Sequence, residues 1–219
     1  MATSETKGSG SRGGRTGGGG SGGESKNWID SLSDAEKDAV SEYTTSRYQS
    51  INSGLRSENL SKADQAIVAQ LDAALDKSRL SKEATLFENQ KLYRAADIPE
   101  VNAALKSGKI EGLTYTDKGF VSTTRDAGVA RSFKRSNDAQ LFVIHAPKGT
   151  KAADVEALSA FGKGGKGKGE SETLLARNMT FRVSKVERVK EKYQTRDLKG
   201  KTVTRTRTQQ YIHVDVIGQ

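Results

Sequence analysis

The sequence predicts an α+β fold, with an N-terminal helical lobe followed by a small, mixed or antiparallel split β-sandwich. Two observations predict it. Apolar residues first recur at helical spacing, and short runs that alternate with a period of two then take over and continue to the end of the chain. Helices that come first and strands that follow them favour α+β, because a doubly wound sheet requires the two kinds of element to alternate.

The N-terminal segment, residues 1–26, is rich in glycine and serine, and we predict a disordered tail. Ten of the 23 glycines of the chain lie in the first 25 residues, and most of the others there are Ser, Thr or charged. Such a segment buries too little apolar surface to offset the entropy of ordering it. The folded domain should therefore cover residues 27–219, with the helical lobe over 27–90 and the β core over 91–219.

Two helices are predicted in the lobe. Ser33 and Glu36 have the spacing of a capping box, so a helix should begin there and continue to about Ser50. A second helix is predicted over 62–77, where apolar residues recur at helical spacing, namely Ile67, Leu71, Ala74 and Leu75.

The β core should begin with a strand around residues 92–94. A short helix that starts at Pro99 should follow it. In chain order, the sequence then predicts a strand in GFVSTT, a short helix in DAGVARSFKRS, a buried strand in AQLFVIHAP and an extended segment in TLLARNMTFRVSKVERV. The last segment, TVTRTRTQQYIHVDV, alternates like an antiparallel edge strand.

The composition excludes several kinds of site. The chain has no cysteine, which excludes disulfides, thiolate metal sites and cysteine nucleophiles. No stretch approaches the roughly 18 apolar residues of a membrane span, and the polar N-terminus is not a signal peptide. We therefore expect no membrane partner and a cytoplasmic location, in the producing cell or in a target cell that the protein reaches by injection or by phage delivery.

Positive charge gathers towards the C-terminus. The net charge is +9, and residues 185–210 contain nine Lys or Arg against three acidic residues. Such a run attracts phosphates, which makes nucleic acid a candidate partner. The favoured explanation is a solvated hairpin whose charges prevent edge-to-edge association, because the run is poor in aromatic residues that stack on bases.

The stretch GKGGKGKGESE, residues 162–172, matches two phosphate-binding motifs without their structural context. Its glycines fit G-x-G-x-x-G and most of a P-loop. Both motifs need a strand before the glycines and a helix after them, because the helix N-terminus binds the phosphate. Here DVEALSAF before the loop is typical of a helix or turn, and TLLARNMTFRV after it is typical of a strand. We therefore interpret residues 162–169 as a lengthened substrate loop.

Glu170 and Glu172, which follow this loop, are the first sign of an active site. In an extended segment, residues i and i+2 point to the same face, so both carboxylates would share one site. Their repulsion costs free energy unless a cation or a reaction uses them. Solvated charges that flank an aggregation-prone strand are the alternative. Arg94 in LYRA and Ser122 in GFVSTT, both near the ends of predicted strands, favour the site.

An arginine, then Ser-Thr-Thr, then Glu-x-Glu, each tied to a strand, resembles the arginine–serine–glutamate class of ADP-ribosyltransferases. The binary actin-modifying toxins, the vegetative insecticidal toxins and related bacterial and phage enzymes are most similar. The resemblance covers about residues 28–189 and includes the segments YTTSRYQSIN, LFVIHAPKGT and ETLLARNMTFRV. It implies the ADP-ribosyltransferase fold, NAD as a substrate, no metal and a monomer.

The resemblance implies a role for each residue of the motif. Arg94 would bind the pyrophosphate of NAD with a rigid, permanently charged fork. Glu172 would hydrogen-bond the ribose and stabilise the oxocarbenium-like cation that forms when nicotinamide leaves. Ser122 would hold Glu172 and the ribose in place. The further cofactor contacts that it implies are Tyr43, Tyr48, Asn52, Thr123, Phe133 and Arg135.

Glu170 would determine the acceptor. A guanidinium is a poor nucleophile until a carboxylate orients it and accepts its proton, and in the family a glutamate at this position goes with arginine as acceptor. We therefore expect mono-ADP-ribosylation of an arginine in a target protein, with Phe161 and Glu170 recognising that protein. ADP-ribosylation of nucleic acid, hydrolysis of NAD and a non-catalytic basic binding module are the alternatives.

Overall fold

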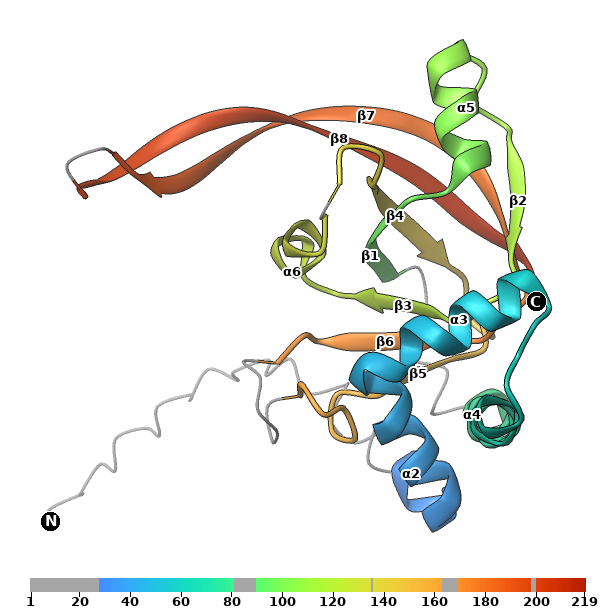
Figure 1. Cartoon of the computed structure of the whole chain (residues 1–219). Coiled ribbons are helices and arrows are strands. Elements are labelled where there is room, and N and C mark those ends of the chain that lie inside the picture. Colours follow the sequence, from blue (N-terminus) through green and yellow to red (C-terminus); the bar gives the residue numbers. More distant parts are fainter. Residues whose placement is uncertain (1–27, 81–89, 135, 163–168, 198–199) are drawn as a thin grey trace, which may run out of the picture.

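The computed structural model describes residues 28–80, 90–134, 136–162, 169–197 and 200–219. Within these ranges, the helices of the lobe precede all the strands, and the predicted α+β class is confirmed (Figure 1). The predicted tail lies outside the described residues. None of the helices in the described ranges is both long enough and apolar enough to cross a membrane.

The helical elements are α2 (Asp34–Glu42), the π-helical turn η1 (Tyr43–Arg47), α3 (Tyr48–Ser57), α4 (Lys62–Leu80), α5 (Pro99–Ser107) and α6 (Ala127–Ser132). The strands are β1 (Gln90–Ala96), β2 (Thr114–Asp117), β3 (Val121–Thr124), β4 (Gln140–Ala146), β5 (Ala152–Asp154), β6 (Glu172–Leu175), β7 (Met179–Arg196) and β8 (Thr202–Gly218).

The strands form one mixed sheet that is divided near its middle. Their order is β2-β7-β8-β4-β1-β3-β6-β5, and neighbours are antiparallel except for the parallel pair β4 and β8. β1 pairs with β4 over its whole length, but it meets β3 only at Tyr93 and Thr124. The sheet therefore consists of two groups of strands, β2-β7-β8-β4-β1 and β3-β6-β5. Figure 1 shows these groups diverging between β1 and β3, as expected for a split sandwich.

The first helix begins at the predicted capping box. Ser33 Oγ accepts a hydrogen bond from Glu36 N at 3.3 Å, and the Glu36 carboxylate accepts one from Ser33 N at 2.6 Å. The single helix predicted to reach about Ser50 is wrong, because the chain kinks at η1. Thr45 leaves the helical region there, with φ −77° and ψ −156°. Local side-chain hydrogen bonds to the backbone produce such kinks.

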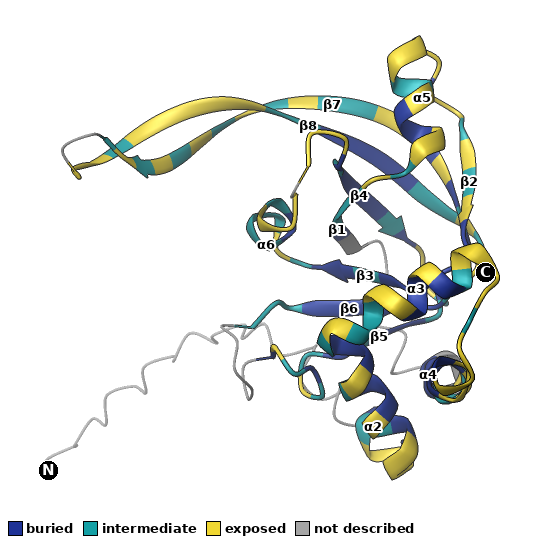
Figure 2. Ribbon diagram, viewed as in Figure 1, coloured by how far each residue is buried: buried dark blue, intermediate teal, exposed yellow. Residues whose placement is uncertain are grey.

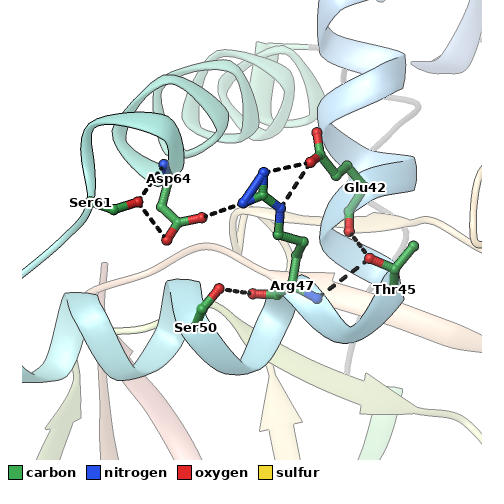
Figure 3. Close-up of polar contacts among 6 residues, drawn as sticks. All are labelled: Glu42, Thr45, Arg47, Ser50, Ser61 and Asp64. Atoms are coloured by element: carbon green, nitrogen blue, oxygen red, sulfur yellow. Dashed lines mark hydrogen bonds and ion pairs between the residues drawn. The ribbon is translucent and has the colours of Figure 1, made fainter.

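Polar side chains hold this kink in place (Figure 3). Thr45 Oγ1 donates to the Glu42 carbonyl at 2.5 Å and accepts a hydrogen bond from Arg47 N at 3.4 Å. The Arg47 guanidinium bridges Glu42, at 2.8 Å, and Asp64 in the first turn of α4, at 3.2 Å. The kink is therefore fixed against the next helix, and Tyr43, which begins η1, is fixed with it.

Helices and sheet share one hydrophobic core. Figure 2 shows buried faces on the helices and nearly continuous burial along β3, β4 and β6. Val40, Ile51, Leu71 and Phe120 belong to this core and are at most 1% exposed. Trp28 is also buried in this core, and its indole N–H donates a hydrogen bond to the Ala74 carbonyl of α4 at 2.9 Å. The core thus holds the lobe rigidly against the strands that carry the site.

β7 and β8 extend beyond the sheet as a long two-stranded ribbon (Figure 1). The prediction of an edge strand here is wrong for the second half of β8, where residues 211–215 lie between β7 and β4. Ile212 and Val214 are fully buried there, because their side chains pack in the main hydrophobic core. Residues 202–210 pair with β7 alone.

Candidate active site

A buried hydrogen-bonded cluster joins the helical lobe to β3. Tyr43 is fully buried, and its hydroxyl lies 3.5 Å from Ser122 Oγ. Asn52 Nδ2 donates to the same hydroxyl at 2.9 Å, and Asn52 Oδ1 accepts from Phe120 N at 2.9 Å. A Cβ on Gly119 would lie 2.7 Å from Asn52 Oδ1, so glycine permits this close approach. Burial raises the pKa of Tyr43 to about 12, which keeps its hydroxyl neutral.

Glu172, the first residue of β6, is a buried carboxyl group beside Ser122. Burial raises the pKa of Glu172 to about 7, and the negative charges of Glu170 and Glu156 act in the same direction. Hydrogen bonds from Ser122 and Ser159 partly oppose this effect. The negative charge of Glu172 is therefore unfavourable in the free protein, and a cation placed beside it would relieve the cost.

The turn between the two glutamates is built around a third carboxylate, Glu156. Its Oε2 accepts hydrogen bonds from Glu170 N and Glu172 N, each at 3.2 Å. Ser171 and Gly169 have φ angles of 48° and 83°, in the left-handed region. Left-handed residues direct nearby backbone N–H groups towards a common point and so create a concavity that binds anions. The Glu156 carboxylate occupies that concavity.

The end of β3 fixes the other side of this turn. Thr124 Oγ1 donates to the Glu170 carbonyl at 2.6 Å, and Arg125 N donates to the Ser171 carbonyl at 3.3 Å. The expectation that the two glutamates share a face of an extended segment is therefore wrong in its geometry. A left-handed turn, held between Glu156 and β3, brings them together.

Glu170 is the more exposed member of the pair. It is half-buried, whereas Glu172 is only 7% exposed. Burial raises the pKa of Glu170, and the charge of Glu156 raises it further. A carboxylate whose pKa is raised accepts a proton more readily, as a general base must.

Phe161 lies on the surface next to this turn. It is 44% exposed, and its N–H donates to Ser159 Oγ at 3.2 Å. Ser159 in turn hydrogen-bonds Glu172, so the aromatic ring is two residues from a contact of the buried carboxyl. A Cβ on Gly162 would lie 1.9 Å from the Glu156 carbonyl oxygen, so glycine is required for the turn to close.

Arg94 in β1 is paired with Asp117 at the end of β2. Its Nη1 lies 3.0 Å from Asp117 Oδ2, and Arg56 from α3 binds the same carboxylate through two N–H groups at 2.9 and 3.0 Å. Burial alone would raise the pKa of Asp117, but Arg94 and Arg56 outweigh it and lower that pKa. These three side chains line a cavity of about 520 Å³.

The two arginines of this cavity offer N–H groups to an anion. The cavity as a whole has no excess of positive charge, because cationic and acidic side chains line it together, namely Arg56, Arg94 and Lys118 with Asp97, Glu100 and Asp117. Arginine binds phosphates through paired N–H groups. Arg94 and Glu172 act on the Tyr43 hydroxyl in opposite directions, since Arg94 lowers its pKa and Glu172 raises it. Arg94 and Arg56, which we call the arginine cluster, therefore belong to the same electrostatic site as Glu170 and Glu172.

The remaining predicted contacts take less direct positions. Tyr48 is half-buried against the core, and Thr123 is buried with its hydroxyl bonded to a backbone carbonyl of β6. Phe133 follows α6 and is 39% exposed. Arg135 and the loop residues 163–168 lie outside the described residues.

Sequence reasoning missed four residues of this site, namely Arg56, Asp117, Glu156 and Ser159. Asp117 and Glu156 each lie at or just after a strand end, next to a predicted site segment, and that position is the signal that could have found them. Arg56 gave no signal in its local sequence. Within the described ranges, no three His, Asp or Glu side chains are grouped so that they could hold a metal ion.

With the geometry established, comparison with known families identifies the fold. The model of the ADP-ribosyltransferase exoenzyme family matches residues 22–210. The chain belongs to this family. The resemblance to this family inferred from Arg94, Ser122 and the Glu170–Glu172 pair is thereby confirmed.

Three curated relatives support this assignment. The NAD(+)–arginine ADP-ribosyltransferase EFV of Enterococcus faecalis is 26% identical over 176 residues, which cover 77% of this chain and 32% of EFV. Exoenzyme T of Pseudomonas aeruginosa is 35% identical over 102 residues, covering 46% of this chain and 20% of that protein. Secreted exoenzyme S of the same organism is 29% identical over 152 residues, covering 69% and 29%. The chain thus spans less than a third of the length of these relatives.

Solved structures share the fold. Plx2a, an ADP-ribosyltransferase toxin from Paenibacillus larvae, has a TM-score of 0.64 and 20% identity, covering 90% of this chain and 92% of the toxin. C3stau2 from S. aureus, whose structure was solved with NAD, has a TM-score of 0.60 and 20% identity, covering 90% and 94%. The predicted ADP-ribosyltransferase fold is confirmed.

Proposed function

We propose that this chain transfers ADP-ribose from NAD to an arginine side chain of a target protein and releases nicotinamide. One observation carries the proposal: the buried Glu172, whose pKa is raised, lies one residue from the more exposed Glu170 in a turn that holds both. The buried carboxylate suits a cation that forms inside the site, and the exposed one suits an acceptor that arrives from outside. The name of the relative EFV includes arginine as its acceptor, which supports the same assignment.

In the proposed reaction, the arginine cluster binds the pyrophosphate of NAD. Arg94 supplies a fork whose position is set by Asp117, and Arg56 adds charge on the same side. Because the guanidinium is already oriented by an ion pair, little side-chain entropy is lost when the phosphates bind. Tyr43 and Asn52 then hold Ser122 at the ribose.

Glu172 stabilises the cation that forms when the nicotinamide–ribose bond breaks. The departing nicotinamide takes the bonding electron pair and leaves positive charge on the ribose, as in glycoside hydrolysis. A carboxylate in a buried site interacts strongly with such a charge, because little water screens it. The positive ribose also offsets the cost of the buried negative charge, so the carboxylate form of Glu172 becomes favourable as the reaction proceeds.

Glu170 receives the acceptor. It orients the incoming guanidinium, whose nitrogen attacks the ribose carbon, and it accepts the proton that this nitrogen loses. Phe161, exposed beside the turn, provides an apolar contact for the target protein. We propose that the enzyme acts as a monomer, as the resemblance to the family implies.

Nucleic acid is the second candidate acceptor, and the basic ribbon formed by β7 and β8 favours it. Water is the third, which would make the reaction NAD hydrolysis. We propose that the enzyme acts inside a target cell, which it reaches by injection or phage delivery; one relative, exoenzyme S, is named as a secreted protein.

The test uses NAD that carries the label on its adenylate, incubated with the chain and a cell extract. Label released by protease but resistant to nuclease, and located on arginine by mass spectrometry, supports the proposal. Label released by nuclease would assign a nucleic acid acceptor instead. If nicotinamide is not released by folded protein, the enzymatic proposal fails.

Glu170→Gln separates the two glutamates in the same assay. Transfer to arginine should fall by roughly 100-fold, because the amide cannot accept the proton, whereas NAD hydrolysis should change only slightly. Glu111→Gln, at an exposed position in the connection between α5 and β2, is the matched control and should change neither. Equal losses of transfer and hydrolysis in Glu170→Gln would contradict separate roles for the two carboxylates.

A further inference from the structure

The ribbon formed by β7 and β8 leaves the sheet as an arm, which we define as residues 188–196 and 202–210. These residues pair with one another and with no other strand among the described residues. Figure 1 shows the arm passing over α6 and reaching well beyond the rest of the molecule. Because side chains alternate along a strand, the arm has two faces.

The inner face of the arm faces α6, and its one acidic residue is paired there. Glu191 pairs with Arg131 of α6 at 3.3 Å and with Arg207 on the opposite strand at 3.6 Å, and it accepts a hydrogen bond from the Tyr211 hydroxyl at 2.5 Å. The Arg207 guanidinium also lies 5.0 Å from the centre of the Tyr193 ring. This face therefore already uses its acidic and aromatic residues within the protein.

The outer face carries charge of one sign. Arg188, Lys190, Lys192 and Arg196 occupy it on β7, and all four are exposed. Their partners across the ribbon are neutral and polar, namely Gln210, Thr208, Thr206 and Thr202. None of the ion pairs found in the described part of the chain involves these four cations.

The positive charge of the arm is divided unevenly between its two faces. The acidic Glu191 lies on the inner face, so the outer face keeps its full positive charge. Successive cations two residues apart on a strand are about 6.7 Å from one another. The result is a row of positive charges, interrupted once at Gln194, with hydroxyl groups beside it, which is suited to a polyanion.

The side chains of the outer face fit a nucleic acid duplex better than a single strand, an acidic protein or a lipid surface. It has no aromatic ring on which the bases of a single strand could stack. It also lacks the apolar centre typical of a protein interface and the apolar side chains that insert into a lipid surface. A two-stranded ribbon, with its right-handed twist, fits the major groove of a duplex, where Lys, Arg and Thr contact phosphates.

We propose that the outer face of the arm binds the phosphate backbone of double-stranded nucleic acid. The inference concerns binding alone and does not depend on which group accepts ADP-ribose. The arm would hold the enzyme near a duplex, and its contact with α6 through Arg131 joins the arm to the element that follows β3 of the active site.

The test measures binding of the full chain to a fluorescent duplex of mixed sequence over a range of salt concentrations. The variant Lys190→Gln/Lys192→Gln/Arg196→Gln removes three cations of the outer face. We expect weaker binding at every salt concentration and a slope of log K against log salt that falls by about 3, because each cation removed leaves one phosphate without its positive partner.

The control variant Lys62→Gln/Lys106→Gln/Lys148→Gln removes the same charge from exposed positions outside the arm and should leave the slope unchanged. Both variants should keep the melting temperature and the rate of nicotinamide release of the unmodified chain, which shows that they are folded. Equal effects of the two variants would overturn the proposal. Tighter, arm-dependent binding to a single strand, to vesicles of anionic lipid or to an acidic protein would overturn it too.

Discussion

Glu172 and Asp117 are both buried carboxyl groups of the same site, 7% and 8% exposed, yet their surroundings move their pKa values in opposite directions. Burial raises the pKa of Glu172 to about 7, with Glu170 and Glu156 adding to the effect. Burial acts on Asp117 in the same sense, but Arg94 and Arg56 outweigh it and lower the pKa. Burial acts to raise both pKa values, and the charges of the neighbours decide whether that effect is reinforced or reversed.

The opposite pKa shifts indicate different roles: Asp117 orients Arg94, and Glu172 takes part in the reaction. Asp117 stays charged and keeps Arg94 oriented for the pyrophosphate, so its interactions are complete before substrate binds. Glu172 is surrounded by negative charge, and its carboxylate is fully stabilised only when a cation forms beside it. The charge of Asp117 is thus compensated by Arg94 and Arg56 before substrate binds, whereas the charge of Glu172 is not compensated.

The two groups should also affect stability with opposite signs. The pKa of Glu172 is higher in the folded chain, so its contribution to stability is present below about pH 4.5 and is lost as the pH rises through about 7. The pKa of Asp117 is lower in the folded chain, so its contribution is present above the ordinary value and is lost as the pH falls through the folded value.

The largest effect should follow Glu172→Gln. The amide has no negative charge for the ribose cation, so we expect nicotinamide release to fall by roughly 1,000-fold with or without an acceptor. Chromatographic measurement of nicotinamide, under saturating NAD, checks this. Activity within tenfold of the unmodified chain would contradict the role of Glu172.

Asp117→Asn should destabilise the folded protein, because it removes the carboxylate that pairs with Arg94 and Arg56. Removing the carboxylate leaves Arg94 and Arg56 without their anion, and we expect a loss of roughly 3 kcal/mol in the free energy of unfolding at pH 7. Urea unfolding measures it, and the loss should shrink as the pH falls towards 3. Glu58→Gln, at an exposed ion pair with Lys118, is the control and should change the free energy of unfolding far less. A loss at pH 7 no larger than that of the control would contradict the orienting role of Asp117.

Glu172→Gln should make the protein more stable at high pH even as it removes activity. The unmodified chain must ionise this buried group above pH 7, and the amide avoids that cost, so we expect a gain of roughly 2 kcal/mol at pH 8 after the weaker hydrogen bonds to Ser122 and Ser159 are allowed for. The gain should vanish near pH 4. A loss of stability at pH 8 would show that the carboxylate is satisfied in the free protein.

The sequence predicted those parts of the site that lie in local patterns. Arg94 and Ser122 lie in short segments whose strand character was visible. The spacing of Glu170 and Glu172 was visible too, although the extended segment expected for them is a turn. The capping box at Ser33 was likewise predicted and confirmed, because both of its hydrogen bonds are local. The α+β class followed from the change of period along the chain.

The rest depended on contacts between distant segments. Arg56 reaches Asp117 across 61 residues, and Glu156 binds the turn 14 to 16 residues ahead of it. The kink at Thr45 and the left-handed Ser171 follow from hydrogen bonds that no periodicity encodes. The second half of β8 was mistaken for an edge because parallel pairing with β4 leaves no sign in the alternation of β8 itself.

The most direct test of the account concerns Glu156, whose charge helps to raise the pKa of Glu172. The measurement is kcat/KM for nicotinamide release as a function of pH, in the unmodified chain, in Glu156→Gln and in the exposed control Glu111→Gln. Glutamine keeps an oxygen for the N–H groups of Glu170 and Glu172 but removes the charge. We predict that activity of the unmodified chain and the control falls below about pH 7, and that the fall moves to lower pH in Glu156→Gln. A fall near pH 4.5 in the unmodified chain, or the same profile in all three proteins, would contradict the claim that crowded carboxylates hold Glu172 ready for a cation.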